Sequence, residues 1–85
     1  MELDNQRYTK VKRILNPFYK NENYKLNYLM ENDELLIFAS INECNELPED
    51  VLQQVASALD GTYKCSTVVN QEYRYLFNLN PCGNN

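Results

Sequence analysis

The residues of this chain with the most evident chemical potential are its carboxylates. Segment 31–50 contains seven acidic residues and no basic residue. These are Glu31, Asp33, Glu34, Glu43, Glu46, Glu49 and Asp50. Carboxylates at this density could act as general acids or bases, ligate a cation, or present negative charge to a basic partner.

The groups that usually accompany catalytic or metal-binding carboxylates are missing from the sequence. It contains no histidine, the commonest general base and metal ligand. Its two glycines, Gly61 and Gly83, cannot form a Gly-rich phosphate loop. The run 31–34 lacks the alternating ligands and the central glycine of an EF-hand. We therefore predict a protein that is not an enzyme, with no catalytic residues and no cofactor.

The cysteines also favour a structural role over a chemical one. There are three of them, without a CxxC pair, which predicts no zinc site. They are Cys44, Cys65 and Cys82. An odd number of widely spaced thiols fits a reducing compartment better than a disulfide framework. Because the N-terminus also lacks the pattern of a signal peptide, the expected location is the cytoplasm.

Charge is distributed unevenly along the chain, and this distribution indicates the kind of partner. Residues 1–25 carry six basic and three acidic side chains, residues 26–85 carry two basic and nine acidic ones, and the net charge is −4. An acidic body repels nucleic acid and attracts basic surfaces. No apolar run approaches the roughly 20 residues of a membrane span. The expected partner is another protein with a basic or apolar surface, rather than nucleic acid or a membrane.

Aromatic residues form a second group of candidates for partner binding. The chain contains seven tyrosines and three phenylalanines. The candidates are Tyr24, Tyr28, Phe38, Tyr73 and Tyr75. In the pattern Tyr73-x-Tyr75-x-Phe77 three rings share one face of a strand, which is core if helices cover it and a recognition surface if it points outward.

Helical periodicity predicts two helices that position these groups. In the first, Tyr8, Val11, Leu15 and Phe18 form an apolar stripe. Asp4 or Asn5 can cap this helix, and Asn16-Pro17 should end it. In the second, Pro48 lies near the start, and the stripe contains Val51, Leu52, Val55, Ala56 and Leu59. Gly61 is the expected left-handed residue after that helix.

Alternating patterns predict two hairpins between and after the helices. Residues 24–30 form a half-buried strand, and residues 33–41 form a strand that is apolar on both faces and therefore interior to a sheet. In the second hairpin, strands 62–69 and 73–79 flank a turn. Its first strand is expected to place Tyr63, Cys65, Thr67 and Val69 on one face.

These elements define the expected architecture. The order α-β-β-α-β-β predicts a single α+β domain over residues 1–80, with helices on one face of an antiparallel sheet. Residues 81–85 are expected to form a flexible C-terminal tail.

Three segments carry a resemblance to a known family. They read DELLIFASI (33–41), LPEDVLQQVASALDGTY (47–63) and YRYLFNLNP (73–81). Together they resemble the middle of small acidic type III secretion chaperones of the Tir-chaperone kind. The resemblance implies a non-enzymatic adaptor whose apolar strand positions bind an extended segment of a client. It also leaves open a homodimer formed through the helix at 51–59.

A second hypothesis comes from another functional class. Small acidic domains without catalytic residues also look like inhibitors encoded by phages or other mobile elements, of the anti-CRISPR or anti-nuclease type. In such an inhibitor the acidic residues of segment 31–50 would form one face that mimics nucleic acid and occupies a basic groove.

Overall fold

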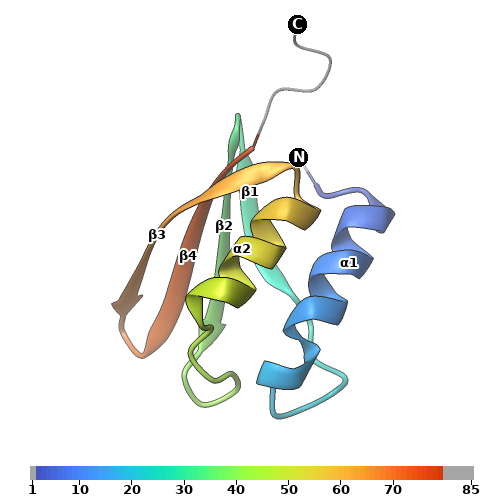
Figure 1. Cartoon of the computed structure of the whole chain (residues 1–85). Helices are drawn as coiled ribbons and strands as arrows, with labels where there is room; N and C mark the ends of the chain where they lie inside the picture. Colours follow the sequence, from blue (N-terminus) through green and yellow to red (C-terminus); the bar gives the residue numbers. More distant parts are fainter. Residues whose placement is uncertain (1, 80–85) are drawn as a thin grey trace, which may run out of the picture.

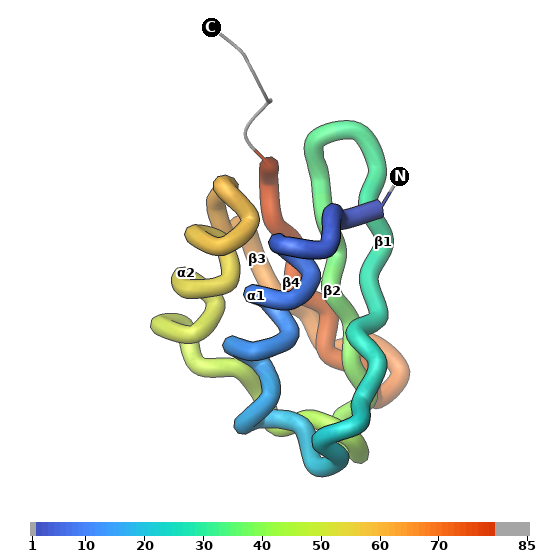
Figure 2. Tube along the Cα trace, turned by 90° about the vertical axis from the view of Figure 1, so that its right-hand side faces the viewer, coloured from blue at the N-terminus to red at the C-terminus, as the bar shows by residue number. Residues whose placement is uncertain are grey.

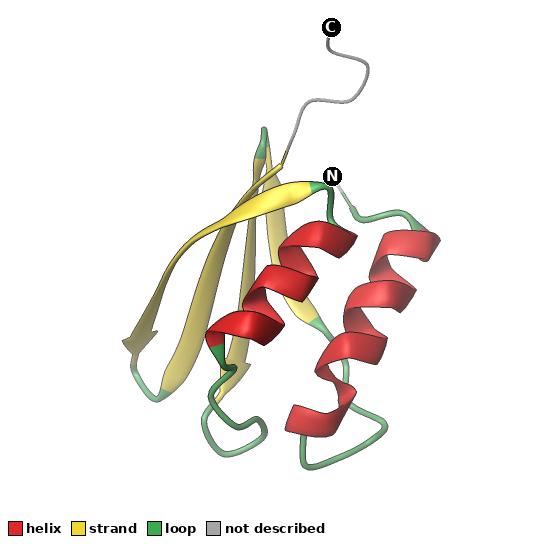
Figure 3. Ribbon diagram, viewed as in Figure 1, coloured by secondary structure: helices red, strands yellow, loops and turns green. Residues whose placement is uncertain are grey.

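Two antiparallel helices cover one face of a four-stranded antiparallel sheet (Figure 1; Figure 3, helices red and strands yellow). The computed structural model describes residues 2–79. Its elements are α1 (Asn5–Leu15), the 3-10 turn η1 (Asn16–Phe18), β1 (Asn27–Glu31), β2 (Glu34–Ser40), α2 (Glu49–Ala58), β3 (Gly61–Val69) and β4 (Glu72–Leu79). The predicted α+β class and element order are confirmed. The predicted tail at 81–85 lies outside the described residues.

Helix α1 begins and ends where the sequence predicts. The Asp4 carboxylate accepts a hydrogen bond of 2.8 Å from the backbone N–H of Arg7, which caps the helix. Val11 and Leu15 are completely buried. The helix ends at Leu15 although Asn16 keeps helical backbone angles, with a φ of −51° and a ψ of −45°. Pro17 has no N–H to continue the helical hydrogen bonds, so the chain tightens into η1.

Helix α2 buries its entire predicted stripe. The residues of this stripe all belong to the core: Val51, Leu52, Val55 and Ala56 in the helix, and Leu59 directly after it. The acidic side chains of Glu49 and Asp50 lie in the first turn, where they complement the positive end of the helix dipole. The remaining exposed positions of this helix are Gln53, Gln54 and Ser57. The exposed side of α2 is therefore polar.

The chain reverses after α2 at Asp60, and not at Gly61 as the sequence suggested. Asp60 has a φ of 59°, a left-handed conformation that a short polar side chain tolerates. Gly61 is the first residue of β3, and a Cβ atom there would collide with the backbone oxygen of Asn78 in β4. The prediction of a left-handed Gly61 is wrong, because this glycine serves the close approach of two strands.

The sheet has the order β1-β2-β4-β3, so β2 is an interior strand as predicted. Leu35, Ile37 and Ala39 of β2 face the helices and are buried. The other side chains of this strand, among them Leu36 and Phe38, lie on the opposite face and are half-exposed. Figure 2 shows both helices on the same side of the sheet. In residues 2–79, no helix covers the opposite face.

A β-bulge in β3 changes which residues share a face. Tyr63 pairs with Phe77, but the next paired residue, Cys65, is opposite Leu76. Lys64 is the extra residue of the bulge. Tyr63 consequently lies on the helix-covered side, with its ring centroid 5.6 Å from that of Phe77. The expectation that Tyr63 shares a face with Cys65, Thr67 and Val69 is wrong, because the extra residue reverses the alternation.

Candidate functional site

The seven candidate carboxylates are all exposed, but the fold does not bring them together. Glu31, Asp33 and Glu34 surround the β1–β2 turn, while the others occupy the β2–α2 loop and the start of α2. Those others are Glu43, Glu46, Glu49 and Asp50. The two groups lie at opposite ends of the sheet (Figure 1). Strand β2 separates them by roughly 20 Å, at about 3.3 Å per residue. They do not form a single acidic face.

The arrangement of acidic and thiol groups offers no metal centre. Within residues 2–79, no group of three or more histidine, cysteine or acidic side chains is placed to hold a metal ion. One carboxylate of the first group, Glu34, forms an ion pair of 3.6 Å with Lys64 on the neighbouring end of β3. Both side chains are about half exposed, so this pair adds little to stability.

Two of the aromatic candidates, Tyr24 and Tyr75, are core residues. The hydroxyl of Tyr24 donates a hydrogen bond to the backbone oxygen of Lys12 in α1. The hydroxyl of Tyr75 accepts one of 3.1 Å from the backbone N–H of Leu47. Burial raises the pKa of both phenols, that of Tyr75 to about 12. Tyr75 is turned toward the helices by the alternation of β4, and Tyr24 lies in the extended segment before β1. Because both rings are buried, they support the fold and are not available to a partner.

The other three aromatic candidates are half-buried. Tyr28 in β1 accepts a hydrogen bond of 3.1 Å from the backbone N–H of Leu3, which ties the N-terminal segment to the sheet. The Tyr73 ring stacks on Tyr75, with a centroid distance of 6.2 Å. Phe38 is the one candidate aromatic on the helix-free face of the sheet.

A buried cluster around Cys44 was not anticipated from the sequence. The rings of Tyr19 and Tyr24 stack with centroids 3.7 Å apart, and Tyr19 forms a β-bridge with Cys44. These contacts join the connector after η1 to the β2–α2 loop. Burial raises the pKa of the Cys44 thiol to about 11. Burial therefore keeps this thiol protonated and makes it a poorer nucleophile than an exposed thiol.

The helix-free face of the sheet carries an apolar row that crosses the strands. Strand register places Leu29 of β1 opposite Leu36 of β2, and Leu36 opposite Leu76 of β4. We call these three residues the leucine row. Cys65 of β3 continues it, and Phe38 lies beside it. Leu29 is 63% exposed, which makes it the most exposed large apolar side chain in residues 2–79.

Charged residues border the leucine row on both sides. Glu31 and Glu34 lie toward the β1–β2 turn, where they and the row line a shallow pocket of about 180 Å³. Arg74 and Glu72 lie on the other side, joined by an ion pair of 3.0 Å. An apolar centre with a charged rim is the usual composition of a protein–protein interface.

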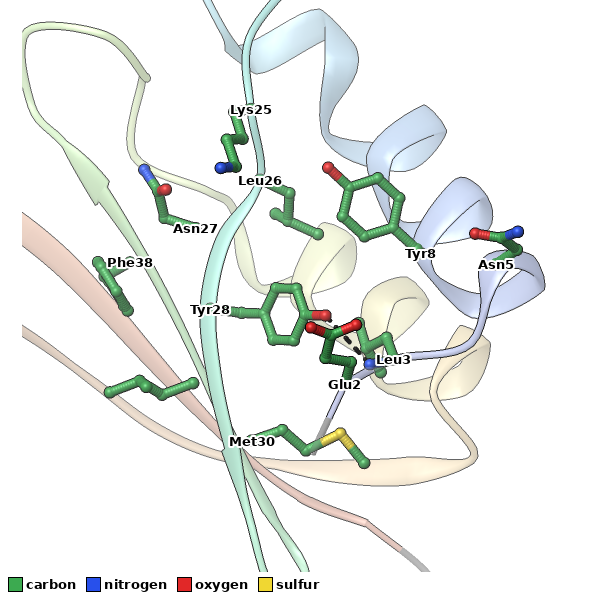
Figure 4. A pocket seen from close by; sticks show the side chains of 11 residues that line it. Glu2, Leu3, Asn5, Tyr8, Lys25, Leu26, Asn27, Tyr28, Met30 and Phe38 are labelled. Atoms are coloured by element: carbon green, nitrogen blue, oxygen red, sulfur yellow. Dashed lines mark hydrogen bonds between the residues drawn. The ribbon is translucent and has the colours of Figure 1, made fainter.

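A second hollow follows the outer edge of β1. It has a volume of about 630 Å³ and lies on both sides of that strand. Figure 4 shows Tyr28 and Leu26 directed toward α1, while Asn27 and Phe38 lie on the other side of the strand. The edge strand is therefore accessible from both faces of the sheet.

The residues of the leucine row were missed as candidates, although the sequence contains a signal for them. Leu29 and Leu76 occupy strand positions that the alternating pattern assigns to the polar side. An apolar residue at such a position points away from the core. What the pattern could not show is that three such residues from three strands would be aligned.

Comparison with known proteins identifies no relative of this chain. No family model matches it, and no curated protein or solved structure matches it significantly. The resemblance to secretion chaperones therefore stays a prediction. Among the described helices, neither is long and apolar enough to cross a membrane.

Proposed function

We propose that this protein is a non-enzymatic protein-binding module, a chaperone-like adaptor that holds an apolar segment of another protein against its sheet. The observation that carries the proposal is the leucine row on the helix-free face. Its three side chains come from three adjacent strands and form one continuous apolar strip. Exposed apolar strips with charged rims are typical of interaction sites.

The geometry of the helices directs the proposed contact to the sheet. In the chaperone family that the sequence resembles, the second helix would be a candidate for dimerisation. Here the apolar residues of α2 are buried in the core, except for the partly buried Ala58, and its exposed positions are polar. The larger apolar surface available to a partner lies on the opposite side of the molecule.

We place this adaptor in the cytoplasm as part of the same proposal. Cys44 is buried and Cys65 is exposed, and both are free thiols. An exposed free thiol persists in a reducing compartment, whereas oxidising compartments favour its pairing.

Affinity capture of the tagged chain from its native cell extract tests the proposal. The wild-type protein would be compared with the double variant Leu36→Lys/Leu76→Lys. The matched control Gln53→Lys/Gln54→Lys adds the same charge to the exposed side of α2. Bound proteins would be identified by mass spectrometry at low and high salt, and urea unfolding would establish that each variant is folded.

The expected result is a partner that resists high salt, remains bound to the α2 control, and is lost from the sheet variant. A partner held equally well by the folded sheet variant would overturn the proposal. If the protein turns over a substrate, and substitution of one carboxylate abolishes that turnover, the prediction that it is not an enzyme is wrong.

The alternative of an inhibitor that mimics nucleic acid has less support. Its acidic residues lie in two groups at opposite ends of the sheet, so only three or four carboxylates could enter one basic groove. The variant Glu31→Lys/Asp33→Lys/Glu34→Lys separates the two hypotheses. Mimicry requires that this variant lose a nucleic-acid-processing partner, and that the wild-type complex dissociate as salt rises.

A further inference from the structure

The outer edge of β1 has backbone groups directed away from the sheet. The backbone N–H of Leu79 in β4 donates to the oxygen of Asp33, at 2.7 Å. Odd-numbered residues along β2 therefore bond toward β4, and even-numbered ones bond toward β1. The partners of those even-numbered residues include Leu29, which leaves the N–H and C=O groups of Tyr28 and Met30 pointing outward.

Partly exposed side chains lie on both faces of the sheet along this edge. The hollow of about 630 Å³ lies along β1 on both faces of the sheet. Tyr28 and Met30 line it on the helix side, and Leu29 lines it on the other. All three side chains are at least partly exposed. Strand β1 pairs with β2 without a bulge.

The opposite edge of the sheet is less suited to pairing. Strand β3 contains the bulge at Lys64, and bulges and lysines are common means of preventing edge-to-edge association. Strand β1 contains neither proline, nor lysine, nor a bulge. Of the two edges, that of β1 is the one open to strand addition.

Charge indicates which strand would fit. An exposed base, Lys25, lies just before β1, and the acids Glu31 and Asp33 lie at its end. If a second copy of β1 is placed antiparallel to the first, with Leu29 of both copies on the two-fold axis, Lys25 of each copy lies near the acids of the other. In the same register Tyr28 faces Met30 of the second copy, so the outward backbone groups pair.

We propose that two copies of this chain associate through their β1 edges, in an antiparallel arrangement centred on Leu29. The two sheets become one continuous eight-stranded sheet, and the two leucine rows meet at the axis. This inference stands independently of the proposed partner, because it rests on the β1 edge and not on a bound client.

Sedimentation equilibrium of the purified full chain over a range of concentrations tests the inference. The wild-type chain is expected to show a dimer mass at high concentration. Leu29→Lys places two like charges at the axis and should raise the dimer dissociation constant at least about tenfold. Because Leu29 is 63% exposed, the fold should tolerate the change. The matched control is Val68→Lys on β3, where the side chain is 61% exposed.

A charge exchange provides an independent test that leaves Leu29 in place. Lys25→Glu should raise the dissociation constant by about tenfold, and adding Asp33→Lys should restore much of the lost affinity. Leu36→Lys, which alters the leucine row one strand away from the edge, should leave the dimer intact. A variant of the leucine row can therefore lose client binding while it keeps the dimer, which separates failure of the proposed function from failure of this inference.

Two results would overturn the inference. One is a wild-type chain that stays monomeric at millimolar concentration. The other is a dimer whose dissociation constant does not change in Leu29→Lys and Lys25→Glu, or one that the control Val68→Lys dissociates. Either outcome would locate the contact elsewhere.

Discussion

The hydroxyl of Tyr75 in β4 accepts a hydrogen bond of 3.1 Å from the backbone N–H of Leu47, just before α2. Both residues are buried, and 28 positions separate them in the chain. The bond satisfies a donor that water cannot reach and holds the start of α2 against the sheet. It also explains why Tyr75, a candidate for partner binding in the sequence, belongs to the core.

Removing that hydroxyl should destabilise the protein. We expect Tyr75→Phe to lower the free energy of unfolding by about 1–2 kcal/mol, because the Leu47 N–H remains buried without an acceptor. Urea unfolding followed by circular dichroism would measure the change. The control is Tyr73→Phe, because the partly buried Tyr73 ring lies on the same face of β4 and stacks on Tyr75. Equal losses from the two variants would contradict the role assigned to Tyr75.

Gly61 should not tolerate a side chain. A Cβ atom at this position would meet the backbone oxygen of Asn78, and backbone atoms cannot move aside as side chains do. Gly61→Ala should therefore cost about 1–3 kcal/mol of stability by overpacking. Thermal and urea unfolding would measure this cost, with Ala at the exposed neighbour Thr62 as the control. An ordinary surface substitution changes the free energy of unfolding by no more than about 0.5 kcal/mol. A change that small for Gly61→Ala would contradict the close approach of the two strands.

Gln71 is a site where glycine should stabilise the fold. Asn70 and Gln71 form the two-residue β3–β4 turn with φ values of 52° and 61°. Hairpin turns of this kind favour glycine at the second position, because glycine has no Cβ to oppose a positive φ. Gln71→Gly should add about 1 kcal/mol to the free energy of unfolding. Ser57→Gly, in the ordinary helical conformation of α2, should instead lose about 1 kcal/mol.

Stability should fall at alkaline pH. Burial raises the pKa of Cys44 from 9.0 to about 11 and that of Tyr75 from 10.0 to about 12. The folded state then retains protons that the unfolded state loses, so this contribution to stability is complete below pH 9 and decreases as pH rises through 11 and 12. Unfolding free energies measured from about pH 8 to about pH 11 test this, because that range contains the titrations of the thiol and the phenols in the unfolded chain.

The variant Cys44→Ala isolates the thiol in that experiment. It should be less stable than the wild type at pH 8, because a small cavity replaces the sulfur. Its stability should nevertheless decline less steeply between pH 9 and 10, where the unfolded thiol titrates before the phenols do. Identical slopes for the two proteins would show that the thiol does not contribute.

Local sequence determined the two helices with their buried stripes, and the positions of the strands. Val11 and Leu15 could be assigned to the core from helical spacing, because that period follows from backbone geometry alone. Alternation placed Leu35 and Ile37 on one face of β2, but both faces of this strand are apolar, so the pattern did not show which face the helices cover. The same local information located the cap at Asp4 and the end of α1 before Pro17. The antiparallel pairing of β1 with β2 also follows from the two-residue turn that joins them.

Tertiary structure decided what the surface presents. The leucine row exists because β2 pairs with β4, which is separated from it by α2 and β3, and only that register aligns Leu36 with Leu76. The bulge at Lys64 turns Tyr63 inward, although the local pattern continues without a visible break. The acidic residues are neighbours in the sequence, yet β2 carries them to opposite ends of the sheet. The leucine row and the face of Tyr63 depend on pairing between strands that are distant in the sequence, and the separation of the acids depends on the extended length of β2. Local periodicity does not encode these relationships.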